Sequence, residues 1–204
     1  MPVDLERLNE SIFFEYRFIS CYSDCMNKFE KFLSGGDLRS IGASNKIVKE
    51  IDTQEEFDQL FRFLFHPDRL VVMRAADAIE KISHQHPEYL QKHNKELFEI
   101  AGRNTEKELK WHLAQILPRL RHSKTSFDKS WKLLLLWAKD TNNSRIVRVN
   151  SIQALYELTL IEKKFAKELL ELFSDLSRED VPSITARIRK SQKQMINSKS
   201  TDSK

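Results

Sequence analysis

Residues Met73 to Ile82 read MRAADAIEKI, and the spacing of large, small and polar side chains in this stretch returns twice further along the chain. Its apolar positions lie three and four residues apart, which is typical of one face of an α-helix. Each return comes after 38 residues. The equivalent positions are Met73, Trp111 and Val149; Ala76, Ala114 and Ile152; Ala78, Ile116 and Ala154; Ile79, Leu117 and Leu155; and Ile82, Leu120 and Leu158.

A second apolar pattern lies between these copies and predicts a second helix in each unit. Counted from a first aromatic residue, its apolar positions come at 0, +4, +7, +8 and +11. The copies begin at Phe57, Tyr89, Phe127 and Phe165, of which the last three are again 38 residues apart. The last two copies are complete, the first is shortened, and the second has His93 and Glu96 at apolar positions.

A period of 38 residues that holds two helices predicts an α-solenoid, because each helical pair has an apolar side that only neighbouring pairs cover. The composition agrees, since charged residues make up 31% of the chain and only nine of its 204 residues are Gly or Pro. Such a composition favours long helices over turn-rich β-structure. We therefore predict an all-α fold, a right-handed α-α superhelix of about four to five helical pairs.

The last copy of the first helix carries a resemblance to a known family. Ile146-Val147-Arg148 is followed by Ser151, Ala154-Leu155 and Leu158. This order resembles the HEAT repeat, in which Val-Arg precedes small and aliphatic residues at fixed steps. The stretches 72–82 and 109–120 look like divergent copies, and the resemblance spans roughly residues 57 to 190. It implies a HEAT-like solenoid and says little about function.

We expect a single HEAT-like domain over residues 1–190. Residues 1–36 form an aromatic-rich capping region, residues 37–180 the repeats, with a first helix over about 38–51, and residues 181–190 a polar cap. Pro118 departs from the repeat pattern and is expected to bend its helix, because proline removes one helical hydrogen bond. Residues 191–204 hold few apolar side chains, so we predict a disordered tail there.

The net charge of +4 conceals an uneven distribution along the chain. Residues 1–106 hold 14 Lys and Arg against 19 Asp and Glu, whereas residues 107–204 hold 20 against 11, so the two halves carry −5 and +9. A basic half favours association with an acidic partner, nucleic acid included.

Cations recur at the repeat period and form a candidate binding ladder. Arg69, Lys107 and Arg145 are spaced by 38 residues just inside the predicted first helices, and Lys110 and Arg148 are spaced in the same way. One interpretation is a row that follows the phosphates of a nucleic acid. The alternative is structural, because the resemblance implies that Lys110 and Arg148 occupy the basic HEAT position, which usually bridges neighbouring repeats. Asp68, Glu106 and Ser144 precede these helices, where an oxygen side chain can cap free backbone N–H groups or complement the helix dipole.

A polar row is embedded among the apolar positions of the first helices. Asp77, Gln115 and Gln153 are equivalent residues spaced by 38. Buried polar groups require partners, so we expect a hydrogen bond from each to a neighbouring helix or loop. A row that faces a ligand is the alternative. Trp111, Trp131 and Trp137 are expected in the core, although Trp137 lies off the second-helix pattern, which leaves an exposed position open for it.

A more distant resemblance links the chain to the HEAT-like alkylpurine DNA glycosylases. That family implies an aromatic platform beside a carboxylate that stabilises a cationic sugar. Here Trp111 is followed four residues later by Gln115, and Asp77 has no tryptophan before it. An enzyme of this kind is therefore the least favoured reading.

No other pattern in the sequence indicates catalysis, a cofactor or a metal. Gly-rich phosphate loops, nucleophile elbows and His-Glu-x-x-His motifs are absent. Cys21 and Cys25 lack two further ligands nearby, and His84, His86 and His93 are expected at the surface. Neither a secretory signal nor a run of about 18 apolar residues occurs, so we expect a cytoplasmic protein that does not span a membrane.

These observations predict a non-enzymatic binding or scaffold protein that uses its solenoid surface for protein–protein interaction. The alternative is a nucleic-acid-binding HEAT-like protein that uses its basic C-terminal half. A protein partner predicts an exposed apolar patch, whereas nucleic acid predicts a continuous basic face that includes Lys107 and Arg145. The sequence leaves the partner, the binding face and the oligomeric state open.

Overall fold

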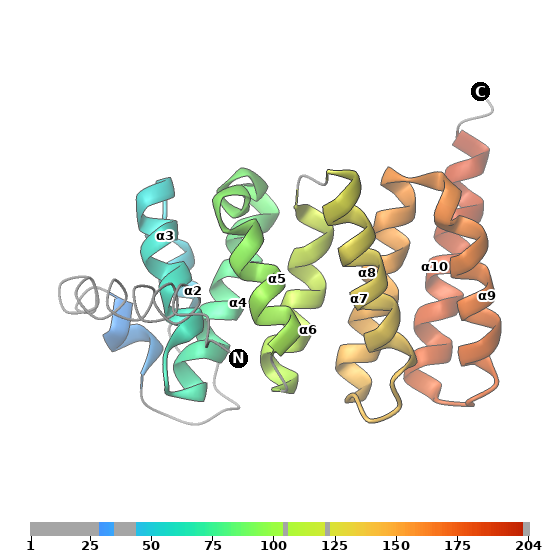
Figure 1. Ribbon diagram of the computed structural model, residues 1–204, viewed down its shortest axis with the longest axis horizontal. Helices are drawn as coiled ribbons and strands as arrows, with labels where there is room; N and C mark the ends of the chain where they lie inside the picture. The colour runs from blue at the N-terminus through green and yellow to red at the C-terminus, as the bar shows by residue number, and fades with distance from the viewer. Residues whose placement is uncertain (1–28, 35–43, 104–105, 121–122, 202–204) are drawn as a thin grey trace, which may run out of the picture. The chain divides into compact units, whose positions relative to one another are not determined.

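The computed structural model describes residues 29–34, 44–103, 106–120 and 123–201, with side chains to residue 197 (Figure 1). Every regular element within these ranges is a helix, as the sequence predicted. The chain divides into two compact units, Met1–Ala78 and Ile79–Lys204, and the division falls inside the continuous helix α4 (Arg69–Gln85). The expectation of one domain over residues 1–190 stays a prediction.

The first unit holds helical residues 29–33, α2 (Ser44–Val48), α3 (Gln54–Arg62), a short 3-10 helix η1 (Phe63–Phe65) and the start of α4. The helix expected over residues 38–51 is shorter at its carboxyl end, because a turn follows Val48; residues 35–43 lie outside the described residues. Thr53 caps α3 by accepting a hydrogen bond from the Glu56 backbone N–H. Of the copy that starts at Phe57, Phe57 and Phe61 are buried on α3 and Leu64 is buried in η1, as the repeat pattern predicts, whereas Phe65 is 36% exposed.

Two buried polar contacts hold α4 in the first unit. The Arg74 guanidinium donates to the carbonyl oxygens of Leu33 and Ser34 at 2.8 and 3.0 Å, at the end of the helical residues 29–33. A cation there complements the negative end of the helix dipole. The Ser44 hydroxyl of α2 donates to Asp77 Oδ2 at 2.6 Å. Asp77 therefore makes the interhelical hydrogen bond that a buried polar residue needs.

The second unit stacks helices in two rows. Figure 1 shows α5, α7 and α9 on the side towards the viewer and α6, α8 and α10 behind them. Helix α8 packs against α6, α7, α9 and α10, so it lies at the centre of the unit. The α-helices are α5 (Asn94–Arg103), α6 (Lys107–Ile116), α7 (Lys124–Lys139), α8 (Arg145–Ile161), α9 (Ala166–Ser177) and α10 (Pro182–Thr201), and the 3-10 helices are η2 (Pro87–His93), η3 (Leu117–Arg119) and η4 (Lys163–Phe165).

The starts of the first helices reproduce the period read from the sequence. Helices α4, α6 and α8 begin at Arg69, Lys107 and Arg145, which are 38 residues apart. The expected caps are only partly present: Asp68 accepts from the Leu70 N–H at 2.8 Å, whereas the N-cap residues Glu106 and Ser144 make no such side-chain bond. Pro118 has the predicted effect, because α6 ends at Ile116 and continues as the 3-10 helix η3.

Aromatic residues at repeat-equivalent positions interlock α7 with η4 and α9. The rings of Phe127 and Phe165 lie 5.2 Å apart, and those of Trp131 and Phe165 lie 4.6 Å apart. The Trp131 indole also donates to Glu168 Oε2 at 2.8 Å, which satisfies its only polar atom. Trp137 is 3% exposed, so the exposed position left open for it is wrong. Its ring packs beneath Lys110, whose Nζ lies 5.8 Å from the ring centroid.

Arg148 ties three successive helices together from the middle of the stack. Its side chain is 4% exposed, its Nε donates to the Ala138 carbonyl oxygen of α7 at 2.8 Å, and its Nη2 contacts both Glu179 carboxylate oxygens, just after α9, at 2.7 and 2.8 Å. A buried guanidinium is tolerated because acceptors surround it. Arg148 is thus a bridge between repeats, which is the structural alternative raised by the sequence.

The carboxyl-terminal helix is longer than expected. We predicted a disordered tail from residue 191, but α10 continues to Thr201, and Ser191 is fully buried one turn beyond the buried residues Ile184 and Ile188. The prediction failed because it counted apolar side chains. A small serine on the packed stripe allows α10 to stay close to α8 and α9, the helices that it packs against.

Replacing Arg148 tests the bridge. Arg148→Met leaves the Ala138 carbonyl and the Glu179 carboxylate without their donor, so we expect a loss of roughly 2–3 kcal/mol in the free energy of unfolding. Arg145→Met, three residues earlier on the same helix and exposed, is the matched control and should change it by no more than about 0.5 kcal/mol. Urea unfolding followed by circular dichroism measures both, and equal effects would contradict the bridging role.

The packing of α10 is tested in the same way. Ile188 is 2% exposed, so Ile188→Ala should create a cavity and cost about 2–4 kcal/mol. Ile196, on the same helix and 69% exposed, should tolerate alanine with little change in the unfolding midpoint. If both variants unfold like the unmodified chain, α10 does not close the stack.

Candidate functional site

The structure separates the predicted cationic ladder into two kinds of residue. Arg69, Lys107 and Arg145 are exposed at the first positions of their helices. Lys107 pairs with Glu108 at 3.8 Å. Helices α6 and α8 begin at the same edge of the second unit, so Lys107 and Arg145 share that edge (Figure 1). Arg69 belongs to the first unit.

Lys110 and Arg148 have structural contacts instead. The Lys110 amine donates to Asn143 Oδ1 at 3.1 Å and lies over the Trp137 ring, while Arg148 is buried against α7 and Glu179. Arg119 is used in the same manner, since it donates to the Glu80 backbone carbonyl at 2.6 Å and to its carboxylate at 2.7 Å. These cations join neighbouring elements of the second unit, and Arg119 and Arg148 are paired with the Glu80 and Glu179 carboxylates.

The residues of the predicted polar row form hydrogen bonds, some to a neighbouring helix and some within their own helix. Gln153 of α8 accepts from Arg187 of α10 at 2.8 Å and donates to Glu157 at 2.9 Å. Gln115 donates to the Trp111 carbonyl one turn earlier at 3.4 Å. Together with the Ser44–Asp77 bond, these contacts give each member of the row a protein partner. Asp77 and Gln153 thus make the expected bond to a neighbouring helix, whereas Gln115 bonds to a carbonyl of its own helix.

No metal centre is formed by the part of the chain that the structure describes, because no group of three or more His, Cys, Asp or Glu side chains gathers there. His86 contacts Glu88 at 3.0 Å and stacks on Tyr89, and His84 contacts Glu80 at 2.8 Å. Cys21 and Cys25 lie outside the described residues. None of the described helices combines the length and apolar character that a membrane span needs.

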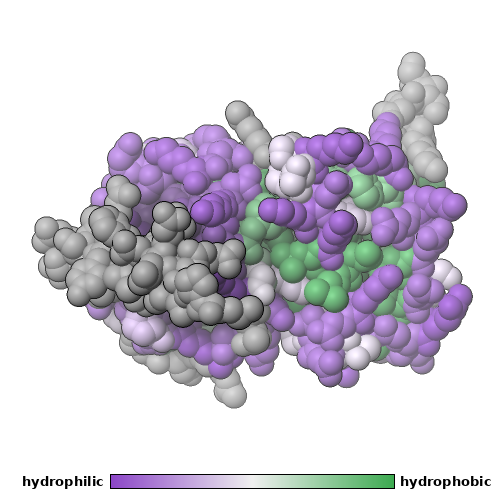
Figure 2. All heavy atoms as spheres, in the orientation of Figure 1, coloured by the Kyte–Doolittle hydropathy of each residue, from purple (hydrophilic) through white to green (hydrophobic). Residues whose placement is uncertain are grey.

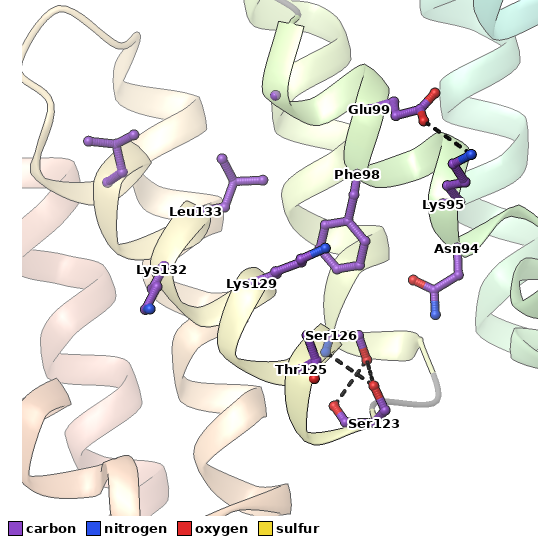
Figure 3. Close-up of a pocket in the computed structure, with 12 residues that line it drawn as sticks. Asn94, Lys95, Phe98, Glu99, Ser123, Thr125, Ser126, Lys129, Lys132 and Leu133 are labelled. Atoms are coloured by element: carbon purple, nitrogen blue, oxygen red, sulfur yellow. Dashed lines mark hydrogen bonds and ion pairs between the residues drawn. The ribbon is translucent and has the colours of Figure 1, made fainter. Parts of the chain in front are cut away.

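An open groove lies between α5 and α7 in the second unit, with a volume of about 830 Å³. In Figure 3, Phe98 of α5 and Leu133 of α7 extend into the interval between the two helices. Residues Thr125 to Leu136 of α7 follow the groove, so its length is about 18 Å at 1.5 Å per helical residue. The lining residues are Asn94, Lys95, Phe98, Glu99, Gly102, Ser123, Thr125, Ser126, Lys129, Lys132, Leu133 and Leu136.

The floor of the groove is apolar and unusually exposed for leucine and phenylalanine. Leu136 is 63% exposed, and Phe98 and Leu133 are partly exposed. Figure 2 shows hydrophobic surface gathered on the face formed by α5, α7 and α9, among hydrophilic side chains. Gly102 keeps the floor open, since a Cβ added there would meet nothing within 4 Å. Exposed apolar patches of this kind mark interaction sites.

Lysines flank the apolar floor on both sides. Lys129 and Lys132 are exposed on α7, and Lys95 is exposed on α5. The one acidic lining residue, Glu99, lies 4.0 Å from Lys95 on its own helix, so these two charges offset each other and the net positive charge of the lining is that of Lys129 and Lys132. Ser123 caps α7 beside the groove by accepting from the Ser126 N–H at 3.2 Å, which fixes the end of the helix that carries the two lysines.

The groove arises where the second-helix pattern is broken. Between α7 and α9, the Trp131–Glu168 pair fills the interval. One period earlier, the equivalent residues are His93 and Ser130, which have less side-chain volume. Behind them α6 and α8 pack closely, so α5 and α7 are held apart by their neighbours rather than joined by their own side chains.

The groove residues were not among the predicted site residues. The sequence did contain features that mark the groove: His93 and Glu96 break the apolar pattern of the second helix, and Gly102 is the single glycine after residue 42. A broken apolar pattern alone does not show whether side chains of other helices fill the space between α5 and α7. The positions of α5 and α7 were needed to see that it stays open.

The lining side chains do not assemble a catalytic set. Ser123 and Ser126 bond to each other and to local backbone, and Glu99 faces Lys95 along α5. What the groove offers is apolar surface bordered by positive charge.

Comparison with protein families agrees with the helical pairs. The sequence matches the HEAT repeat domain over residues 36–195, a span that includes α2 to α9 and most of α10. Comparisons with curated proteins and with solved structures gave no match. Because the match covers most of the chain and the helices recur at a fixed period, the chain belongs to the HEAT repeat family.

Proposed function

We propose that this chain is a non-enzymatic helical-repeat protein that binds a protein partner in the groove between α5 and α7. The observation that carries the proposal is the exposed apolar floor at Phe98, Leu133 and Leu136. HEAT repeat domains are commonly protein-interaction scaffolds, which supports the same reading. The groove supplies the specific surface that such a role requires.

Burial of this floor offers enough free energy for recognition. Covering an exposed leucine or phenylalanine side chain fully contributes about 1.5–3 kcal/mol. Binding energy at interfaces concentrates in a few central residues that polar rims shield from water. Leu136, at one end of the groove, is the most exposed residue of the floor, and Lys129 and Lys132 provide a polar rim.

Substituting Leu136 tests the proposal. Leu136→Ser removes the most exposed part of the floor, so we expect about a tenfold loss of affinity for captured partner proteins, corresponding to about 1.4 kcal/mol. Ile196→Ser is the matched control, since Ile196 is similarly exposed but lies on α10. Quantitative affinity capture from nuclease-treated lysate compares the two with the unmodified chain.

The thermal stability of both variants is measured alongside partner capture. Both substituted positions are exposed, so the thermal unfolding midpoints should stay close to that of the unmodified chain. Partner capture that survives Leu136→Ser, or that falls equally with Ile196→Ser, would count against the groove.

A second candidate function is nucleic-acid binding along the edge where α6 and α8 begin. It is favoured by the exposure of Lys107 and Arg145 and by Arg103 and Lys139, exposed in the last turns of the preceding helices. It is disfavoured by the acids interspersed along this edge, Glu106, Glu108 and Asp140, which nearly balance these cations. The groove is therefore the stronger site.

This candidate makes a separate prediction. Binding through phosphates should weaken steeply with salt, and the double variant Lys107→Glu with Arg145→Glu should reduce both affinity and the salt slope. Filter binding to a mixed nucleic-acid pool at several salt concentrations provides the measurement. Salt-insensitive binding, or the absence of binding, removes nucleic acid from consideration and leaves the groove proposal intact.

A further inference from the structure

The groove has features that restrict the chemistry of its partner, and we infer that its occupant is an amphipathic helix whose apolar stripe is flanked by acidic residues. This inference rests on the proposed function and deepens it. Three properties carry it: the shape of the groove, the hydrogen bonding of its walls and the charge of its rim.

The shape favours a rod laid between two helices. The groove follows α7 for about 18 Å and is bordered on its other side by α5, so an occupant lies beside both. Three to four turns of a helix have this length at about 5.4 Å per turn. A helix in that position would extend the packing of helix on helix that builds the rest of the second unit.

The walls favour an occupant that satisfies its own backbone. Helices α5 and α7 use their backbone N–H and C=O groups internally, and the floor at Phe98, Leu133 and Leu136 offers no polar atoms. An extended peptide laid on this floor would leave backbone groups without partners, which is costly. A helix carries its hydrogen bonds with it and presents side chains three and four residues apart.

The rim selects negative charge. Lys129 and Lys132 lie three residues apart on α7, whereas Lys95 and Glu99 of α5 lie 4.0 Å apart and offset each other, so the net positive charge of the lining is on α7. Glutamates that flank an apolar stripe would meet Lys129 and Lys132 on the α7 side while the leucines enter the floor. Complementary charge at a rim fixes orientation and speeds encounter.

The same features disfavour other acidic macromolecules. A nucleic-acid backbone presents hydrated phosphates, which gain nothing from contact with Leu133 and Leu136. An anionic bilayer needs apolar side chains that project into it, whereas here Phe98 and Leu133 extend into the interval between two helices (Figure 3). A helix fits both the recess and its charged border.

The test uses defined peptides instead of an unidentified partner. Three fluorescein-labelled peptides of about 18 residues, which is about five helical turns and so longer than the groove, share one leucine stripe and differ only in the flanking residues, which are all Glu, all Gln or all Lys. Fluorescence anisotropy at low salt measures their binding to the full chain. We expect the Glu peptide to bind about tenfold more tightly than the Lys peptide, and added salt should narrow the difference.

Variants then assign the preference to the groove. Lys129→Glu with Lys132→Glu should reverse the order of the Glu and Lys peptides, while Lys190→Glu with Lys193→Glu, exposed on α10, makes the same change in net charge and should preserve it. Gly102→Trp should weaken all three peptides by placing a large side chain on the floor, since a Cβ added at this position would have open space around it. Circular dichroism checks that each variant is folded.

The outcomes separate this inference from the proposed function. Equal binding of the three peptides, lost in Leu136→Ser, would overturn the acidic partner and keep the groove as a protein-binding site. No peptide binding, while Leu136→Ser still abolishes capture of partner proteins, would overturn the helical occupant. Binding to phosphatidylserine vesicles without peptide binding would indicate a membrane surface, and a groove-dependent dimer in sedimentation velocity would indicate a second copy; either result overturns the inference.

Discussion

The spacing of the second helices is imposed from behind, by the close packing of the first helices. In the second unit α8 contacts α6 on one side and α10 on the other, and its buried residues include Ser151, Ala154 and Leu155 at the positions that recur every 38 residues. Small side chains at such positions allow helix axes to approach. Once α6 and α8 are fixed, α5 and α7 have no freedom to close the interval between them. The groove is thus a product of the core rather than of its own lining.

In the second unit, the positions of the charged side chains matter more for binding than the net charge does. Its basic balance suggested a cationic surface, yet Arg148, Arg119, Lys110 and Arg187 all donate to acceptors on neighbouring helices or their connecting loops. A guanidinium satisfies several carbonyl and carboxylate oxygens at once, which suits it to joining repeats whose helix ends leave carbonyls unpaired. The lysines that remain at the groove sit on exposed helical positions with long side chains. They are the part of the positive charge available to a partner.

The sequence predicted the fold because the fold is periodic. Equivalent residues such as Met73, Trp111 and Val149 predict equivalent helices. The structure agrees, because these helices begin at Arg69, Lys107 and Arg145, which are 38 residues apart. The errors have local causes. Trp137 departs from the apolar pattern yet is covered by Lys110 and its neighbours, and Ser191 continues an apolar stripe with a small polar side chain. The groove escaped prediction because it depends on the distance between helices that are not adjacent in the chain, and periodicity fixes which residues are equivalent but not how far apart their helices stand.

The Trp131–Glu168 pair and the cluster of Phe127, Trp131 and Phe165 have a further consequence for local stability. They anchor α9 to α7, whereas one repeat earlier the positions of Trp131 and Glu168 hold His93, at the end of η2, and Ser130, whose hydroxyl is buried without a hydrogen bond. Local opening of a protein begins where packing is weakest. Helix α5 is therefore the element of the second unit most easily detached, and amide hydrogen exchange would be fastest there among the second helices. A partner that filled the groove would supply a contact for α5 like the one that the Trp131–Glu168 pair supplies for α9. Binding of the partner and ordering of α5 would therefore be thermodynamically coupled.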